Sequence, residues 1–139
     1  MKSSLTAICL TLVLSLGTIS AAWSAAFQQG VAAYNSGDYA TALREWTPLA
    51  KQGDASAQYN LGQMYRRGQG VPKNHKTAVK YYTLAAKQGD ADAQFNLSDM
   101  YALGKGVLKD YVYAHMWGIL LPLMGMSWVR SCEILLRRK

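Results

Sequence analysis

Cysteine, proline and acidic residues are scarce in this chain of 139 residues. It has two cysteines and three prolines, and only eight Asp and Glu stand against 15 Lys and Arg. Two cysteines cannot form a framework of several disulfides or a four-cysteine zinc site. Three prolines and 12 glycines exclude a collagen-like or low-complexity chain, and an apolar content of 50% argues against intrinsic disorder. The composition therefore predicts one small, basic globular domain, too short for a two-domain enzyme.

A long apolar run occurs near the N-terminus, at Ile8–Leu16. Lys2 precedes it, and small residues follow it up to Ala26. A basic start, a short apolar run and small residues are the three parts of a secretory signal peptide. We predict a signal peptide over residues 1–25, cleaved after Ser24 or Ala26. The alternative is an uncleaved anchor, but the run is short for a bilayer.

Export has consequences for charge and for partners. Loss of Lys2 changes the count from 15 to 14 basic residues against eight acidic ones, which leaves a net charge of +6. Loss of Cys9 leaves Cys132 as the one thiol, with no partner for a disulfide within the chain. We expect a periplasmic or secreted protein, and the export signal argues against nucleic acid as its partner.

The remainder of the chain repeats itself every 36 residues. Asp54–Tyr65 reads DASAQYNLGQMY and Asp90–Tyr101 reads DADAQFNLSDMY. The phrase that ends the preceding block, LAKQGD, returns as AAKQGD one period later. A period of this length is typical of stacked helical units, each unable to bury its apolar face alone. We predict three units, over residues 26–53, 54–89 and 90–118.

Each unit has the pattern of two antiparallel helices. Ala57, Leu61 and Tyr65 recur every four residues and form one helical stripe. Asp54 is a capping residue before the first helix, and Gly68 is suited to end it. A second helix is expected after Asn74 or, in the third unit, after Asp110, with Ala78, Tyr81 or Tyr82, and Ala85 facing inward. The predicted fold is an all-α solenoid, in which the pairs Tyr59/Phe95 and Tyr65/Tyr101 pack between units.

These residues resemble the Sel-like repeat family, which is related to the tetratricopeptide repeats. The second unit has the family's small, glycine and aromatic positions at Ala55, Ala57, Leu61, Gly62, Tyr65, Gly68, Gly70, Val71, Ala78, Tyr81 or Tyr82, Ala85, Ala86 and Gly89. The third unit has them at Ala91, Ala93, Leu97, Tyr101, Gly104, Gly106, Val107, Ala114 and Trp117, with Ser98 where the family has glycine. The first unit, with its short turn at Ser36–Asp38, looks more like a tetratricopeptide unit. The resemblance implies an adaptor that binds a protein or peptide.

The C-terminal residues 119–139 depart from the family pattern. A polar helix closing in Ala-Ala-x-x-Gly is expected there, but the chain continues with the apolar residues ILLPLMGMSWV and a basic end. Val112–Val129 carries no formal charge and is a marginal membrane span, so a membrane-tethered adaptor is one alternative. A last helix kinked by Pro122 is another. A third hypothesis is a frameshift, because one base earlier the codons can encode the missing closure.

No motif in the chain indicates catalysis, a cofactor or a metal. The Gly68–Gly70 and Gly104–Gly106 loops lack the preceding strand of a dinucleotide site, so we interpret them as helix ends. His75 and His115 lack carboxylates at metal-ligand spacing. Cysteine-rich relatives have been linked to β-lactam hydrolysis, which is the enzymatic alternative, but they depend on a disulfide in each unit. We expect no enzyme and no cofactor.

Two sets of surface residues are candidates for binding. Arg66, Lys73, Lys76 and Lys80, together with Arg67, surround one loop and form a basic patch that suits an acidic partner, although such charge runs are usually a solvated face. The first helices of a solenoid line its concave groove. Residues three and four apart share a helical face, which places Asn60, Gln63 and Arg67, and one period later Asn96, Asp99 and Leu103, in that groove.

Overall fold

The computed structural model describes residues 22–120, which form helices joined by turns and contain no strand. A first helix spans residues 22–35 and is followed by α2 (Tyr39–Lys51). The second unit consists of α3 (Ala55–Arg67) and α4 (His75–Ala86). The third consists of α5 (Ala91–Leu103), α6 (Tyr111–His115) and a π-helix, η1 (Met116–Leu120).

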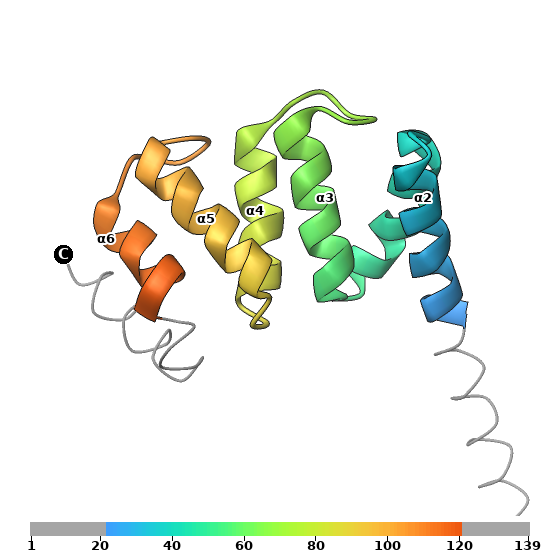
Figure 1. Ribbon diagram of the computed structural model, residues 1–139, viewed down its shortest axis with the longest axis horizontal. Helices are drawn as coiled ribbons and strands as arrows, with labels where there is room; N and C mark the ends of the chain where they lie inside the picture. The colour runs from blue at the N-terminus through green and yellow to red at the C-terminus, as the bar shows by residue number, and fades with distance from the viewer. Residues whose placement is uncertain (1–21, 121–139) are drawn as a thin grey trace, which may run out of the picture.

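The helices stand side by side in a row in which each packs on the next, as Figure 1 shows from α2 to α6. Successive helices run in opposite directions, so the α3–α4 and α5–α6 loops lie along the same edge of the row, the upper one in Figure 1. The turns that lead from one unit to the next lie along the lower edge. The predicted all-α solenoid of antiparallel helix pairs is confirmed.

The helix ends follow the capping chemistry expected from the sequence. The carboxylate of Asp54 accepts a hydrogen bond of 2.7 Å from the amide of Ala57, and Asp90 accepts one of the same length from Ala93. Gly68 ends α3 in the left-handed conformation, with φ of 75°. Local side-chain chemistry therefore sets these boundaries, independently of the packing of the units.

Small residues allow the helices to approach closely. Ala57, Ala78, Ala85 and Ala93 are fully buried at the seams between helices, beside the larger Leu61 and Leu97. One buried cluster joins α2 to α3, and the other joins α4 to α5 and to the helices that follow it. The apolar interior therefore continues from unit to unit, as a solenoid requires.

Two buried glutamines tie each unit to the preceding one. Nε2 of Gln58 donates to the carbonyl oxygen of Ala50 at the end of α2, at 3.0 Å. Nε2 of Gln94 donates in the same way to Ala86 at the end of α4, at 3.2 Å. Both side chains are buried, so each amide satisfies a helix-end carbonyl that water does not reach.

A large residue faces a glycine between the two helices of each of the first two units. A Cβ atom on Gly62 would lie 2.7 Å from the ring of Tyr82, and one on Gly30 would lie 2.7 Å from Cδ1 of Trp46. The third unit reverses the pair, because Ser98 stands at the glycine position and Gly118 at the aromatic one. A Cβ atom on Gly118 would lie 2.7 Å from Oγ of Ser98. The exchange of sizes explains why the third unit tolerates Ser98.

The aromatic residues of α3 pack between units, as predicted, because Tyr59 and Tyr65 lie against the cluster that includes Leu97 and Met100 of α5. Their ring-to-ring contacts, however, lie within their own unit. Tyr59 packs on Tyr82 of its own unit, with ring centroids 5.9 Å apart. Phe95 holds the equivalent position in the third unit, but Gly118 offers it no ring, and Phe95 is 72% exposed. The Tyr65 ring likewise stacks on Tyr81 within its unit, at 5.7 Å.

The two ends of the chain are described only in part. Residues 22–25, expected to end the signal peptide, form the first turn of the helix 22–35, and the rest of that prediction lies outside the described residues. Of the unusual segment 119–139 only the first two residues are described, within η1. No helix within residues 22–120 is long and apolar enough to cross a membrane.

Candidate binding surface

The predicted groove residues occupy one face of α3 and the matching face of α5. Asn60 and Gln63 are half-buried and Arg67 is exposed, while Asn96 and Asp99 are both half-buried. We call these five residues the polar stripe. Leu103, which continues the stripe on α5, is 53% exposed.

The two helices of the polar stripe are neighbours. Burial raises the pKa of Tyr59 on α3, and the carboxylates of Asp92 and Asp90 at the start of α5 raise it further. A hydrogen bond from Asn96 acts in the opposite direction. Nδ2 of Asn96 also donates to the carbonyl oxygen of Asp92 at 2.8 Å. Helices α3 and α5 therefore approach each other where Tyr59 meets Asn96.

At the junction of the first two units, hydrogen bonds join the side chains that meet at the edge of the row where the loops lie. The hydroxyl of Tyr34 donates to Oε1 of Gln69 at 2.8 Å, and Nε2 of Gln69 donates to the hydroxyl of Tyr39 at 2.8 Å. Arg67 donates to the Tyr34 hydroxyl at 3.1 Å. The two tyrosine rings also meet edge to face, 5.4 Å apart.

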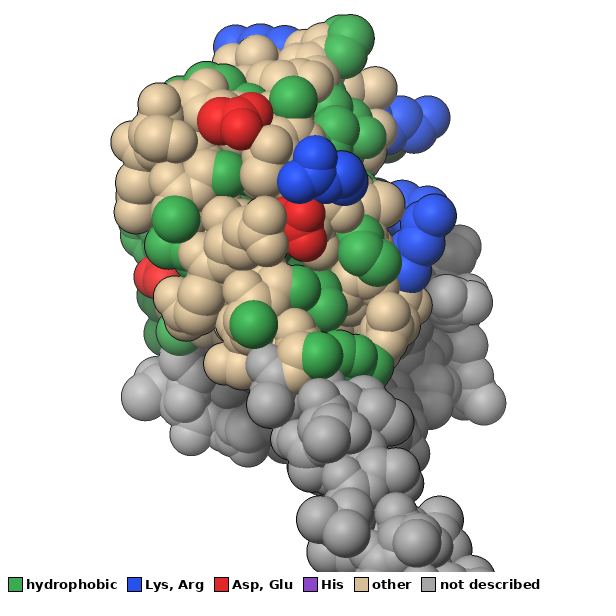
Figure 2. Space-filling view, turned by 90° about the vertical axis from the view of Figure 1, so that its right-hand side faces the viewer, with side chains coloured by type: hydrophobic (Ala, Val, Ile, Leu, Met, Phe, Trp, Pro, Cys, Tyr) green, Lys and Arg blue, Asp and Glu red, His purple; other side chains and the backbone are tan. Residues whose placement is uncertain are grey.

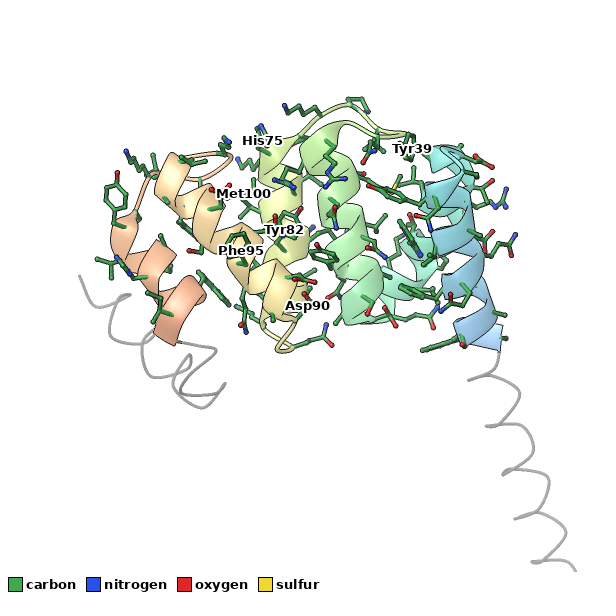
Figure 3. All side chains as sticks on the ribbon, in the orientation of Figure 1. Tyr39, His75, Tyr82, Asp90, Phe95 and Met100 are labelled. Atoms are coloured by element: carbon green, nitrogen blue, oxygen red, sulfur yellow. The ribbon has the colours of Figure 1, made fainter. Side chains whose placement is uncertain are left out.

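At the junction of the second and third units, a pocket of about 430 Å³ opens instead. It lies at the upper edge of the row in Figure 3, where His75 stands at the start of α4, near Met100 on α5. We call it the junction pocket, and it is lined by Arg66, Arg67, Lys73, His75, Asp99, Met100 and Lys105.

The junction pocket joins parts of both residue sets that the sequence singled out. Arg66 and Lys73 come from the predicted basic patch, and Arg67 and Asp99 come from the polar stripe. Lys76 and Lys80, the other members of the patch, are exposed on α4 and do not line it. Sequence reasoning did not assign His75 or Lys105 to a site. The period of 36 residues was the signal for them, since it aligns them with Tyr39 and Gln69.

Polar atoms in and beside the junction pocket lack partners. Nε of Arg66 and Nδ1 of His75 are buried and form no hydrogen bond. Burial raises the pKa of Tyr82 to about 12, although the charge of Arg66 and a side-chain hydrogen bond with Arg66 oppose the shift. Tyr82 is therefore neutral at physiological pH, and the charges here are those of the basic residues.

Cations dominate the electrostatics of the junction pocket. Burial lowers the pKa of His75, and the charges of Lys73, Lys105 and Arg66 lower it further. Asp99 is the single acidic residue of the lining, and no ion pair joins it to a basic side chain among residues 22–120. The lining carries the permanent positive charges of Arg66, Arg67, Lys73 and Lys105, so an anion is the ligand that suits this site.

The end of the row formed by the first unit has a different surface. Figure 2 looks at the end formed by the first unit, where hydrophobic and uncharged side chains are interspersed with charges of both signs. Arg44 and Glu45 form an ion pair of 2.9 Å in this unit. Its charges therefore compensate one another in part, in contrast to those of the junction pocket.

Comparison with known proteins identifies the repeats. The model of the Sel1 repeat family matches residues 55–90 and 91–119. A Sel1 repeat protein from Oxalobacter formigenes is similar in structure, with a TM-score of 0.63 and 36% identity over 66% of this chain. So is c5321, a protective antigen of uropathogenic Escherichia coli with an SLR fold, with a TM-score of 0.64 and 34% identity over 68% of this chain. The matches span 37% and 21% of those two proteins. The search of curated proteins finds no match.

Proposed function

We propose, because residues 55–119 of this chain belong to the Sel1 repeat family, that the protein is an exported scaffold that binds a protein or peptide partner along the polar stripe. Sel1 repeat proteins are generally non-catalytic scaffolds for protein–protein interaction. The observation that supports the proposal most is the half-burial of the amides of Asn60 and Gln63 on α3 and of Asn96 on α5.

The amides of the polar stripe suit the backbone of a peptide. Asn60 and Gln63 each offer a donor and an acceptor, so they can pair with both the amide and the carbonyl of an extended chain. They are half-buried, which fixes their geometry while leaving part of each side chain accessible. A partner bound along the stripe would also reach the junction pocket, because Arg67 and Asp99 belong to both.

The partner surface is tested by capture from an envelope extract. The pair Asn60→Ala and Gln63→Ala removes two amides of the polar stripe without touching a fully buried residue. The control pair, Gln52→Ala and Ser56→Ala, changes two exposed residues outside it. We expect the wild-type and control chains to capture the same species and the stripe variant to lose them. Equal capture by all three chains would remove the assignment of the partner surface.

Export is tested separately, by sequencing the N-terminus of the mature chain. A periplasmic or secreted product is expected to begin at Ala25 or Phe27, the residues that follow the two predicted cleavage positions. Recovery of the chain in the cytoplasm with Met1 or Lys2 at its start would contradict export, while leaving the binding proposal to its own test.

A further inference from the structure

The two junctions between successive units are built from equivalent positions. Gly30 faces Trp46 in the first unit, and Gly62 faces Tyr82 in the second. The two glycines align the first helices of these units with an offset of 32 residues. From the second helix of the first unit onward, equivalent residues are 36 apart. The loop glycines confirm this register, since a Cβ on Gly70 would lie 2.8 Å from Cβ of Tyr39, and one on Gly106 would lie 2.7 Å from the backbone nitrogen that follows His75.

This register aligns three residues of one junction with three of the other. Tyr34 corresponds to Arg66, Tyr39 to His75, and Gln69 to Lys105. Figure 3 shows Tyr39 and His75 along the same edge of the row of helices, the upper one. The residues that satisfy one another at the first junction are thus replaced at the second by three basic side chains.

The replacement changes what the junction can do. At the first junction the three side chains are joined by two hydrogen bonds of 2.8 Å. At the second, Nε of Arg66 and Nδ1 of His75 remain buried without partners, and the space between the elements is open. A guanidinium nitrogen that is buried without an acceptor is costly in a folded protein. An acceptor supplied by a partner would therefore stabilise the second junction at Nε of Arg66.

The charge and shape of the junction pocket indicate the acceptor. Five of its lining residues are basic by type and one is acidic, so an oxyanion is favoured. Asp99 would repel a dianionic phosphate, but its carboxylate can accept a hydrogen bond from the backbone amide of a peptide.

We propose that the junction pocket binds carboxylate side chains of an acidic peptide segment on the partner. The proposal rests on the proposed function and specifies the chemistry of the segment that follows the polar stripe. Arg66 offers a planar guanidinium that suits a carboxylate, Lys73 and Lys105 close the pocket from the two loops, and His75 donates from its imidazole. Asp99 fixes the backbone of the bound peptide.

The test uses the full chain and a fluorescein-labelled peptide of alternating Glu and Gly, with a Gln and Gly peptide as the neutral comparison. The pocket variant carries Arg66→Tyr, His75→Tyr and Lys105→Gln, the residues of the first junction. The charge-matched control carries Lys76→Gln and Lys80→Gln, which remove the same two permanent charges from exposed positions outside the pocket. Fluorescence anisotropy at about 0.15 M salt reports the dissociation constants, since screening there suppresses long-range attraction.

We expect the pocket variant to bind the Glu peptide about tenfold or more weakly than wild type, because charge-assisted hydrogen bonds are lost. The charge-matched control is expected to stay within about twofold, because Lys76 and Lys80 lie outside the pocket and salt screens their charges from the bound peptide. Equal weakening in both variants, or equal binding of the neutral peptide, would overturn the proposal. So would binding of inorganic phosphate without binding of the Glu peptide.

A second variant keeps the test decisive if the triple substitution does not fold. Lys73→Gln with Lys105→Gln changes two exposed side chains of the lining, and it is expected to weaken the Glu peptide as well. Wild-type affinity in this variant, together with an intact circular dichroism spectrum, would also overturn the proposal. Failure here is distinct from failure of the scaffold, which is read from capture by the Asn60 and Gln63 variants.

Discussion

The contact between Gly62 and Tyr82 provides a direct test of the packing within a unit. In Gly62→Ala the added methyl would lie 2.7 Å from Cδ1 and Cε1 of the Tyr82 ring. That is roughly 1 Å inside a normal carbon–carbon contact of about 3.5–4.0 Å. Tyr82 is fully buried between its neighbours, so its ring has no open space to move into.

Two effects of opposite sign determine the free energy of unfolding of Gly62→Ala. Overpacking a buried site costs about 1–3 kcal/mol, while alanine gains about 0.8–1 kcal/mol over glycine inside a helix. The clash is with a buried ring, so we expect it to dominate, with a net loss of up to about 2 kcal/mol. For a domain of this size that corresponds to a fall in Tm of up to roughly 16 °C.

The measurement is thermal unfolding of the full chain, followed by circular dichroism at the helix band. Ser56→Ala, at an exposed position of the same helix, is the control, and we expect it to leave Tm unchanged or to raise it slightly. In a Tyr82→Leu background the ring is absent, so Gly62→Ala should cost less there. A higher Tm for Gly62→Ala in the wild-type background would refute the packing that we describe.

Three further predictions concern helix caps, loops and pH. Asp54→Ala removes the bond to the amide of Ala57, and we expect urea denaturation to show a loss of about 1 kcal/mol. Gly106→Ala should destabilise more than Gly89→Ala, because both glycines have positive φ but only Gly106 lies against another backbone; equal melting temperatures would contradict this. His75 has a lowered pKa in the folded state, so its contribution to stability is present above the unfolded value near 6.5 and is lost as pH falls. We expect His75→Gln to flatten that part of the stability–pH curve.

The helices were predictable from the sequence because local chemistry determines where they begin and end. Asp54 and Asp90 cap the amides that follow them whatever the rest of the chain does. Gly68 ends α3 because a left-handed residue is needed there. Repetition at a fixed period added the stacking of units, since equivalent stripes must bury equivalent faces. Fold class and inward-facing residues such as Ala78 and Ala85 followed from these two signals, whereas the choice between Tyr81 and Tyr82 did not.

The environment of Phe95 was not predictable in the same way. Its match to Tyr59 in the repeat suggested a buried ring, but a ring is buried only if its partner is present. The partner position in the third unit is Gly118, which faces Ser98. The sequence showed Ser98 as a departure from the family pattern, whereas the compensating Gly118 is recognisable only once the contact between the two helices is known.

The junction pocket was not predicted from the sequence, although the fold was. Its residues come from α3, α4, α5 and two loops, and no local pattern connects them. What connects them is comparison within the molecule: the same backbone frame carries Tyr34 and Gln69 at one junction and Arg66 and Lys105 at the other. Selection for stability alone favours the first solution, because it satisfies its own polar groups. The second junction has like charges in place of these hydrogen bonds, which lowers the stability locally. Such a departure is expected where a protein binds a partner.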